Sequence, residues 1–261
     1  MLRHELNGLV YYCFENLTAF NELFHGMFTR LGGVSRSPYD SLNVSYSAGD
    51  NREAVETNHE LICQALGISR EDVATAQQVH GSQVTVVGPE DRGRVLPATD
   101  ALITDSPGVA LLLRFADCLP VLLYDPVHKA LGLAHAGWRG TMAGIAEKTI
   151  LSMMEVYGSR PEDIIAGLGP GIGPCCYQVG TEVIEAAKAS FNCWRELLHT
   201  QGDGSLHFDL REANRRQLAK LGVEKIEEAR LCTACRVDEF FSYRAENGHT
   251  GCFAVVLGRR D

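Results

Sequence analysis

The sequence contains no apolar run long enough to cross a membrane. Such a span requires about 20 consecutive apolar residues, and Arg114, Asp117 and Asp125 interrupt the most apolar region. The N-terminal stretch GLVYYCF follows Glu5 and has no small-residue cleavage site behind it, so no signal peptide is predicted. Internal repeats, low-complexity tracts and Ser/Gly linkers are also missing. We therefore expect one compact domain over residues 1–261.

Basic residues are in the minority, with 24 Lys and Arg against 33 Asp and Glu, which gives a net charge of −9. This balance argues against nonspecific binding to nucleic acid or to an anionic membrane surface. An anionic small-molecule substrate would need a local basic pocket.

The cysteines do not form the regular framework of a disulfide-rich secreted protein. There are nine of them, an odd number at irregular spacing, and Cys175 and Cys176 are adjacent. This usage favours a reducing compartment in which thiols are buried, metal-bound or catalytic. We therefore expect a cytoplasmic protein.

Helical and strand patterns are both present, in irregular order. Helical spacing between capping residues predicts helices at Asp50–Gly67, Gly140–Gly158 and Asp209–Gly222, and a less regular one over 182–198. Short apolar runs predict buried strands at 83–87, 109–113, 121–124, 130–135 and 253–257. Because helices and strands do not alternate strictly, we expect mixed sheets covered by helices rather than a parallel barrel.

The segment 109–141, VALLLRFADCLPVLLYDPVHKALGLAHAGWRGT, brings together two chemically versatile side chains. One predicted strand runs into Cys118 and a later one ends at His135, so the thiol and the imidazole can lie near each other at sheet edges. Such a pair suits a metal ion, or a nucleophile and its base. The alternative is a buried core cysteine beside a hydrogen-bonded histidine.

His80, in QQVHGSQV, is a third candidate ligand just before a predicted strand. Alone it would be a surface or capped histidine. Together with Cys118 and His135 it would complete a His₂Cys set, which leaves the fourth position of zinc open to water or substrate. A structural zinc would instead require four closed ligands.

The motif AGWRGT follows His135 directly and leads into the helix predicted next. A glycine-containing turn at a helix start presents unpaired N–H groups, and Arg139 adds a cationic fork there. We therefore consider Arg139 a candidate phosphate-binding residue. The glycines could equally serve the turn alone.

Other motifs carry less weight. Cys232 and Cys235 form a CxxC without a second pair at zinc-ribbon spacing, so reduced structural thiols are the better interpretation. The Gly- and Pro-rich stretch 167–176 matches no phosphate-loop motif and is interpreted as a tight loop bordering the pocket. His25 and Arg30 adjoin a glycine turn that could bind a ligand. Neither GxSxG nor HExxH is present.

Longer motifs, spread in order over nearly the whole chain, resemble those of the YfiH family, also labelled multicopper polyphenol oxidase or laccase-domain proteins. They are FHGMFTRLGGVS, PYDSLNVS, QQVHGSQV, RFADCLPVLLYDP, GLAHAGWRG, GPGIGPCCYQVG, CTAC and FFSYRAENGHTGCFAVVLG. The resemblance implies an α+β fold of α/β/β/α layers with mixed β-sheets, like that of bacterial toxin cysteine deamidases. It also implies zinc held by His80, Cys118 and His135.

The resemblance further implies an enzyme of purine nucleosides. It would phosphorolyse adenosine, inosine and methylthioadenosine, and deaminate adenosine to inosine. Arg139 and the adjoining helix start would hold phosphate, while Arg30 and Asn43 would line the nucleoside pocket. The expected partners are thus a purine nucleoside and phosphate, and a homodimer is one possibility.

Other functions remain as alternatives. A laccase would gather its coppers with paired HxH motifs, whereas no two of the nine histidines stand two residues apart. Copper could nevertheless enter a His₂Cys site. A cysteine hydrolase that edits peptidoglycan precursors would require a free thiolate at Cys118. A zinc-stabilised binding module would need no catalysis at all.

Overall fold

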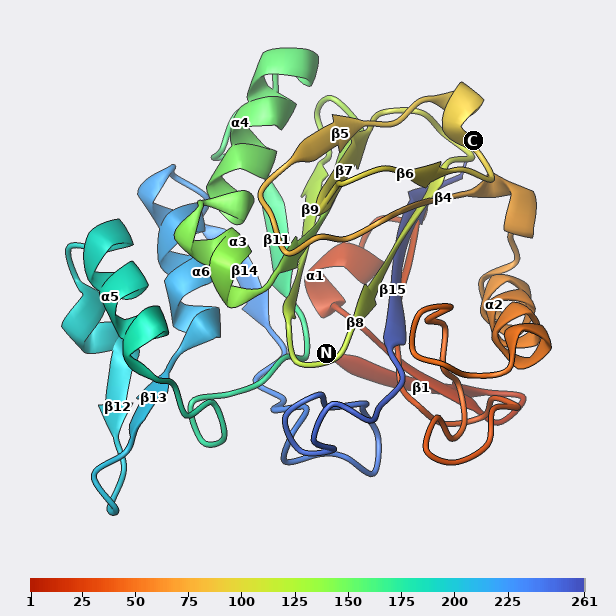
Figure 1. Cartoon of the computed structure of the whole chain (residues 1–261). Helices are drawn as coiled ribbons and strands as arrows, with labels where there is room; N and C mark the ends of the chain where they lie inside the picture. Colours follow the sequence, from red (N-terminus) through yellow and green to blue (C-terminus); the bar gives the residue numbers. More distant parts are fainter. Residues whose placement is uncertain (261) are drawn as a thin grey trace.

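The structure, a computed structural model that describes residues 1–260, contains two large mixed β-sheets (Figure 1). The first has the strand order β1 (Leu2–Leu6), β2 (Leu9–Cys13), β3 (Leu23–Phe28), β15 (Phe253–Arg259), β8 (Ala110–Phe115), β4 (Val73–Ala76), β6 (Val95–Leu96). The second has the order β14 (Lys225–Glu228), β11 (Ile165–Leu168), β9 (Leu119–Asp125), β10 (Ala130–Ala136), β7 (Ala101–Thr104), β5 (Val84–Val86). A small hairpin pairs β12 (Leu198–Thr200) with β13 (Leu206–Phe208).

Helices accompany the sheets, mostly on their outer faces, although Leu17 of the first helix joins the core between the two sheets. They are α1 (Glu15–Thr18), α2 (Arg52–Leu66), α3 (Trp138–Met142), α4 (Ile145–Tyr157), α5 (Thr181–Ser190) and α6 (Leu210–Lys220). Three 3₁₀ turns lie at Arg70–Asp72, Pro89–Asp91 and Trp194–Leu197. Within residues 1–260, none of the helices has the length and apolar character that crossing a membrane would require.

Alternation along the strands produces the layers. In β8, Leu111 and Leu113 join the core between the two sheets, whereas Leu112 joins the core beneath α2. In β9, Leu122 faces the shared core and Leu123 faces the core beneath α4 and α6. Because successive side chains point to opposite faces of a strand, this pattern stacks helix, sheet, sheet and helix. The predicted α/β/β/α layers with mixed sheets are confirmed.

The helix ends follow their capping residues, with corrections of the predicted bounds. The side chain of Asn51, not Asp50, caps α2 by accepting from the Ala54 N–H at 3.0 Å. Asp209 caps α6 as predicted, because its Oδ1 accepts from the Glu212 N–H at 2.9 Å. The helix predicted between Gly140 and Gly158 is confirmed over Ile145–Tyr157, including its end at Gly158, but the residues before it belong to a separate short helix. Gly144 adopts a left-handed conformation with φ of +77° and separates α3 from α4.

The helix expected over 182–198 is also shorter than predicted. It ends at Ser190, because Phe191 adopts an extended conformation and is buried in the core. The following residues form a 3₁₀ turn and then β12. In contrast, each apolar run predicted as a strand is one, and these runs correspond to β5, β8, β9, β10 and β15.

Candidate metal centre and cavity

Loops at one end of the two sheets enclose a cavity of about 900 Å³. The chain enters it after β4, between β8 and β9, after β10 and before β15. Its lining combines histidine and cysteine with arginines and aromatic rings: His80, Arg114, Asp117, Cys118, His135, Trp138, Arg139, Tyr177, Tyr243 and Arg244. A volume of this size falls in the range of small-molecule sites.

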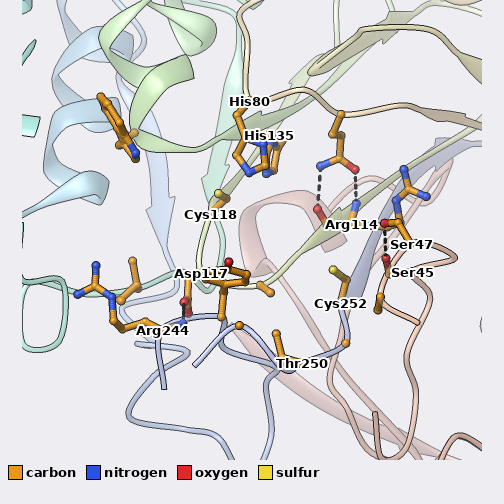
Figure 2. A pocket seen from close by; sticks show the side chains of 18 of the residues that line it. Ser45, Ser47, His80, Arg114, Asp117, Cys118, His135, Arg244, Thr250 and Cys252 are labelled. Carbon is orange, nitrogen blue, oxygen red and sulfur yellow. Dashed lines mark hydrogen bonds between the residues drawn. The ribbon is translucent and has the colours of Figure 1, made fainter. Parts of the chain in front are cut away.

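His80, Cys118 and His135 meet in this cavity, and their side chains converge in Figure 2. One ligand atom from each lies within 4.8 Å of the other two. The imidazole rings of His80 and His135 have centroids 5.0 Å apart and are inclined by 75°. His135 is buried on β10, whereas His80 is exposed on the loop after β4. The structure therefore brings together the three side chains proposed from the sequence as ligands.

Asp100 positions two of these ligands from behind. Its carboxylate is fully buried and accepts a hydrogen bond from Nδ1 of His135 at 2.9 Å. The backbone N–H groups of His80 and Gly81 donate to the same carboxylate at 3.0 and 2.7 Å. With Nδ1 of His135 engaged in this way, Nε2 is the nitrogen left to bind a metal. Burial on its own would raise the pKa of Asp100. The hydrogen bonds from His135 and Gly81 outweigh this effect, so the pKa lies below its ordinary value.

Charge is coupled between Cys118 and His135. Burial alone would raise the pKa of Cys118, but the nearby His135 and the hydrogen bonds from His135 and His80 lower it to about 6. Burial alone would lower the pKa of His135, but the Cys118 thiolate and Asp100 raise it to about 9. The arrangement therefore favours a thiolate at Cys118, which is the form that binds metals and attacks electrophiles.

Two backbone features fix the thiol of Cys118 in place. The preceding residue, Asp117, has a φ of +82°, a region that non-glycine residues rarely occupy. Its carboxylate accepts hydrogen bonds from the Thr233 and Ser242 hydroxyls at 2.6 and 2.7 Å. On the other side, a Cβ at Gly137 would lie 2.9 Å from the Cys118 sulfur, so only glycine leaves room for this thiol.

Arginines give the cavity the local positive charge that the acidic chain otherwise lacks. Arg139, on α3, stacks 4.2 Å above the Trp138 ring and contacts Glu182 at 3.2 Å. Arg114 donates to the Ala76 carbonyl at 2.6 Å and has no carboxylate within salt-bridge distance among residues 1–260. Burial lowers the pKa of Arg114 from its very high ordinary value. Helix α3, which contains Arg139, has only five residues. The positive charge expected at this end of the cavity is therefore supplied by the Arg139 side chain rather than by a long helix.

Arg30 and Asn43, expected from the resemblance to contact the nucleoside, are not among the residues that line the cavity. Arg30 is buried, with Nε donating to the Asp40 carbonyl at 2.7 Å and Nη1 to Glu246 at 3.0 Å. Asn43 is fully buried and accepts from the backbone N–H groups of Ser45 and Cys252 at 2.9 Å each. The polar atoms of both residues thus form hydrogen bonds to neighbouring loop residues. These bonds stabilise the loops next to the cavity.

Other residues proposed from the sequence lie apart from the His₂Cys set. His25 is buried on β3, where its Nε2 accepts a hydrogen bond from the Phe14 N–H at 2.8 Å. The Gly- and Pro-rich loop borders the cavity as expected, through Ile172 and the adjoining Tyr177. Sequence reasoning missed Asp100 and Asp117. The only available signal for Asp100 was chemical, because metal-binding histidines usually donate their second N–H to a carboxylate or carbonyl.

The His₂Cys set fits a divalent metal ion. Two imidazole nitrogens and one thiolate within 4.8 Å of one another form a donor set suited to zinc and also to copper. The cavity adjoins the three donors, so a fourth ligand has space to enter.

Comparisons with known proteins agree with the fold and the motifs. The sequence model of a family described as multi-copper polyphenol oxidoreductase laccase matches residues 24–260. A relative from Bacteroides thetaiotaomicron named purine nucleoside phosphorylase is 38% identical over 241 residues, covering 88% of this chain and 89% of the relative. The solved structure of YlmD from Geobacillus stearothermophilus superposes with a TM-score of 0.92 at 35% identity, covering 99% of this chain and 98% of that one.

A second solved structure, the hypothetical protein YfiH from Bacillus licheniformis, gives a TM-score of 0.90 at 34% identity and covers 98% of both chains. The fold and the cavity thus define an α/β/β/α protein with a His₂Cys centre. The chain belongs to the YfiH family of laccase-domain proteins, as its motifs predicted.

Proposed function

We propose that this chain is a purine nucleoside phosphorylase that binds a purine nucleoside and phosphate in the cavity. The observation that carries the proposal is the position of the His₂Cys set beside several arginines in one cavity of about 900 Å³. The names of the relatives support it, since those from Bacteroides thetaiotaomicron and Geobacillus stearothermophilus are both called purine nucleoside phosphorylase.

Phosphorolysis requires a phosphate oxygen to attack C1′ of the ribose. The bond from C1′ to the purine nitrogen breaks, its electron pair leaves with the base, and the base takes up a proton. Arg139 would bind and orient the phosphate, and Arg114 and Arg244 would add positive charge to the same cavity. The aromatic rings of Trp138 and the exposed Tyr243 in the lining offer flat surfaces for the purine.

In this proposal His80, Cys118 and His135 hold zinc. Zinc, when bound, would supply a Lewis acid that stabilises developing negative charge. Asp100 would keep the proton of His135 on Nδ1 and so hold the ring in its ligating orientation. We extend the proposal to adenosine, inosine and methylthioadenosine as substrates of phosphorolysis and to the deamination of adenosine to inosine at the same centre.

Incubation with adenosine, with and without phosphate, tests both reactions. Chromatography would follow adenine, inosine and hypoxanthine. Adenine that forms only with phosphate would establish phosphorolysis, and inosine formed in either condition would establish deamination. Protein that is folded and metal-loaded but leaves adenosine, inosine and methylthioadenosine unchanged would overturn the proposal.

One arrangement favours a second function. Without a metal ion, Cys118, His135 and Asp100 are ordered as a nucleophile, a base and an orienting carboxylate. A cysteine hydrolase acting on peptidoglycan precursors would use this order. Alkylation of Cys118 by iodoacetamide distinguishes the two functions. Protection by zinc together with nucleoside turnover supports the phosphorylase, whereas precursor hydrolysis that zinc inhibits supports the hydrolase.

The description of the family suggests a third function, the copper-dependent oxidation of phenols, which can also be tested. The metal content of protein purified without added metal would be measured, and oxidation of a phenolic dye compared with nucleoside cleavage. Copper-dependent dye oxidation faster than nucleoside cleavage would replace the phosphorylase by a laccase.

A further inference from the structure

Four cysteines gather at a second place, outside the cavity lining. Cys175 and Cys176 lie on the loop after β11, and Cys232 and Cys235 lie on the turn after β14. The sulfur of each is within 4.8 Å of the other three. The Cys235 sulfur is 3.4 Å from that of Cys175 and 3.3 Å from that of Cys176. The CxxC motif therefore has a second cysteine pair, about 60 residues earlier in the chain.

We propose that these four cysteines bind one metal ion, preferentially zinc, in a closed tetrahedral site. This inference is independent of the function proposed for the cavity. Four thiolates on a tetrahedral zinc, at about 2.3 Å each, lie about 3.8 Å from one another. The Cys235 sulfur lies 3.4 and 3.3 Å from those of Cys175 and Cys176, slightly closer than that value, and no pair is further apart than 4.8 Å. An iron–sulfur cluster places several atoms between its thiolates and would hold the sulfurs further apart.

The backbone around the four sulfurs is arranged to hold them. Gly173 N–H donates to the sulfur of Cys232 at 3.2 Å, and Gly171 forms a β-bridge with the same residue. A Cβ at Gly173 would lie 3.3 Å from both the Cys175 sulfur and the Cys232 Cβ, closer than most Cβ contacts, so the loop packs tightly against the cysteines. N–H donors to thiolate sulfur are the kind of outer contact that supports metal ligation.

The site would be structural, because four protein ligands leave no position for substrate. It would join the loop after β11, which lines the cavity through Ile172 and Tyr177, to the turn after β14, which contacts the lining residue Asp117. Thr233, between the two cysteines of the CxxC, donates to Asp117 at 2.6 Å. Arg244, which lines the cavity, donates to the carbonyls of Cys176 and Gln178 at 3.3 and 2.9 Å. A metal ion here would therefore stabilise one wall of the cavity.

Metal analysis in a Cys118→Ser background tests the four-cysteine site separately from the cavity. The full chain would be purified under reductant, equilibrated with zinc, desalted and analysed by mass spectrometry of the metal. We expect one zinc ion per chain in Cys118→Ser and its loss when Cys235→Ser is added. The matched control adds Cys193→Ser, a half-buried cysteine outside the cluster, and should retain the zinc.

Cobalt replaces zinc in a second measurement, which leaves all four cysteines of the cluster in place and so does not depend on a variant of the cluster folding well. In Cys118→Ser protein, bound Co²⁺ should give the strong thiolate-to-metal absorption and the visible bands of a tetrahedral four-thiolate site. A chelator should then lower the Tm by about 5–15 °C, because a tightly bound ion stabilises the fold.

Three results would overturn the proposal. One is folded Cys118→Ser protein that takes up neither zinc nor Co²⁺. Another is equal zinc retention when Cys235→Ser and Cys193→Ser are compared in that background. The third is a disulfide within the four cysteines in protein purified under reductant. Loss of nucleoside turnover alone would bear on the cavity and not on this site.

Discussion

The His₂Cys set and the four-cysteine cluster are both groups of metal-ligand side chains, but they differ in composition and surroundings. The first takes His80, Cys118 and His135 from three separate chain segments and adjoins a cavity of about 900 Å³. The second takes four thiols from two segments and is not part of that lining. Three donors beside open space suit a metal ion that meets substrate, whereas four donors suit one that stabilises the fold. The ligand number and the adjoining space thus predict that substitutions in the His₂Cys set mainly lower turnover, whereas substitutions in the four-cysteine cluster mainly lower stability.

Cys118→Ser should have the largest effect on turnover. Loss of a ligand to a metal that stabilises transition-state charge should lower kcat/KM for nucleoside by at least about 100-fold. The Tm of Cys118→Ser should fall much less than the Tm of Cys235→Ser. Conversely, Cys235→Ser should retain far more turnover than Cys118→Ser. Steady-state kinetics and thermal unfolding of both variants check the contrast. It would be contradicted if Cys235→Ser lost turnover as completely as Cys118→Ser while remaining folded.

Asp100→Asn should weaken metal binding at the His₂Cys set alone. The amide is nearly the same size but cannot hold the His135 Nδ1 proton as a carboxylate does, so affinity should fall by about 10–100-fold. Competition with a chromophoric chelator would measure this loss. Zinc bound by the four cysteines should be unaffected, and equal weakening at both places would imply a general loss of structure.

Arg139→Gln should raise the KM for phosphate by about 10-fold, because one charge-assisted hydrogen bond to the phosphate is lost. The KM for nucleoside should change less. Arg195→Gln is a matched control, because Arg195 also stacks on a tryptophan, at 4.5 Å from the Trp194 ring, but lies outside the cavity lining. If Arg139→Gln left the KM for phosphate unchanged, Arg139 would not be the phosphate ligand, and the same measurement on Arg114→Gln and Arg244→Gln would test the other two arginines of the cavity.

Gly173→Ala should have the smallest effect, and it should act on the four-cysteine cluster only. The added Cβ would lie 3.3 Å from the Cys175 sulfur and would displace the thiols slightly, at a cost of about 1 kcal/mol of stability. Denaturant unfolding in the presence of zinc would measure this cost. Gly137→Ala makes the corresponding change beside Cys118, and it should alter nucleoside turnover more than the free energy of unfolding.

The parts of the fold that were predictable from the sequence are those set by local chemistry. Asp209 and the glycine ends marked the helices, and the apolar runs marked the central strands β8, β9 and β10. Strands that mix apolar and polar residues were not predicted from the sequence. In β3 all six residues are buried, but His25 and Gly26 interrupt its apolar run. Its place in the sheet depends on pairing with the distant β15, which spacing along the chain does not reveal.

The His₂Cys set and the four-cysteine cluster also differ in how far local sequence pattern reveals them. For the His₂Cys set, Cys118 directly precedes β9 and His135 lies near the end of β10, the antiparallel neighbour of β9, so their proximity followed from local pattern. For the four-cysteine cluster, the parallel bridge between Gly171 and Cys232 brings its halves together. No local signal in the sequence encodes that bridge. The CxxC was therefore interpreted as reduced structural thiols.

The position of β15 has a consequence for biosynthesis. This strand, from Phe253 to Arg259, lies inside the seven-stranded sheet, between β3 and β8. Until it leaves the ribosome, β3 and β8 have no shared partner, and one edge of each stays unpaired. Completion of this sheet is therefore expected only once Phe253–Arg259 has left the ribosome, and a nascent chain stalled before Phe253 should remain sensitive to protease.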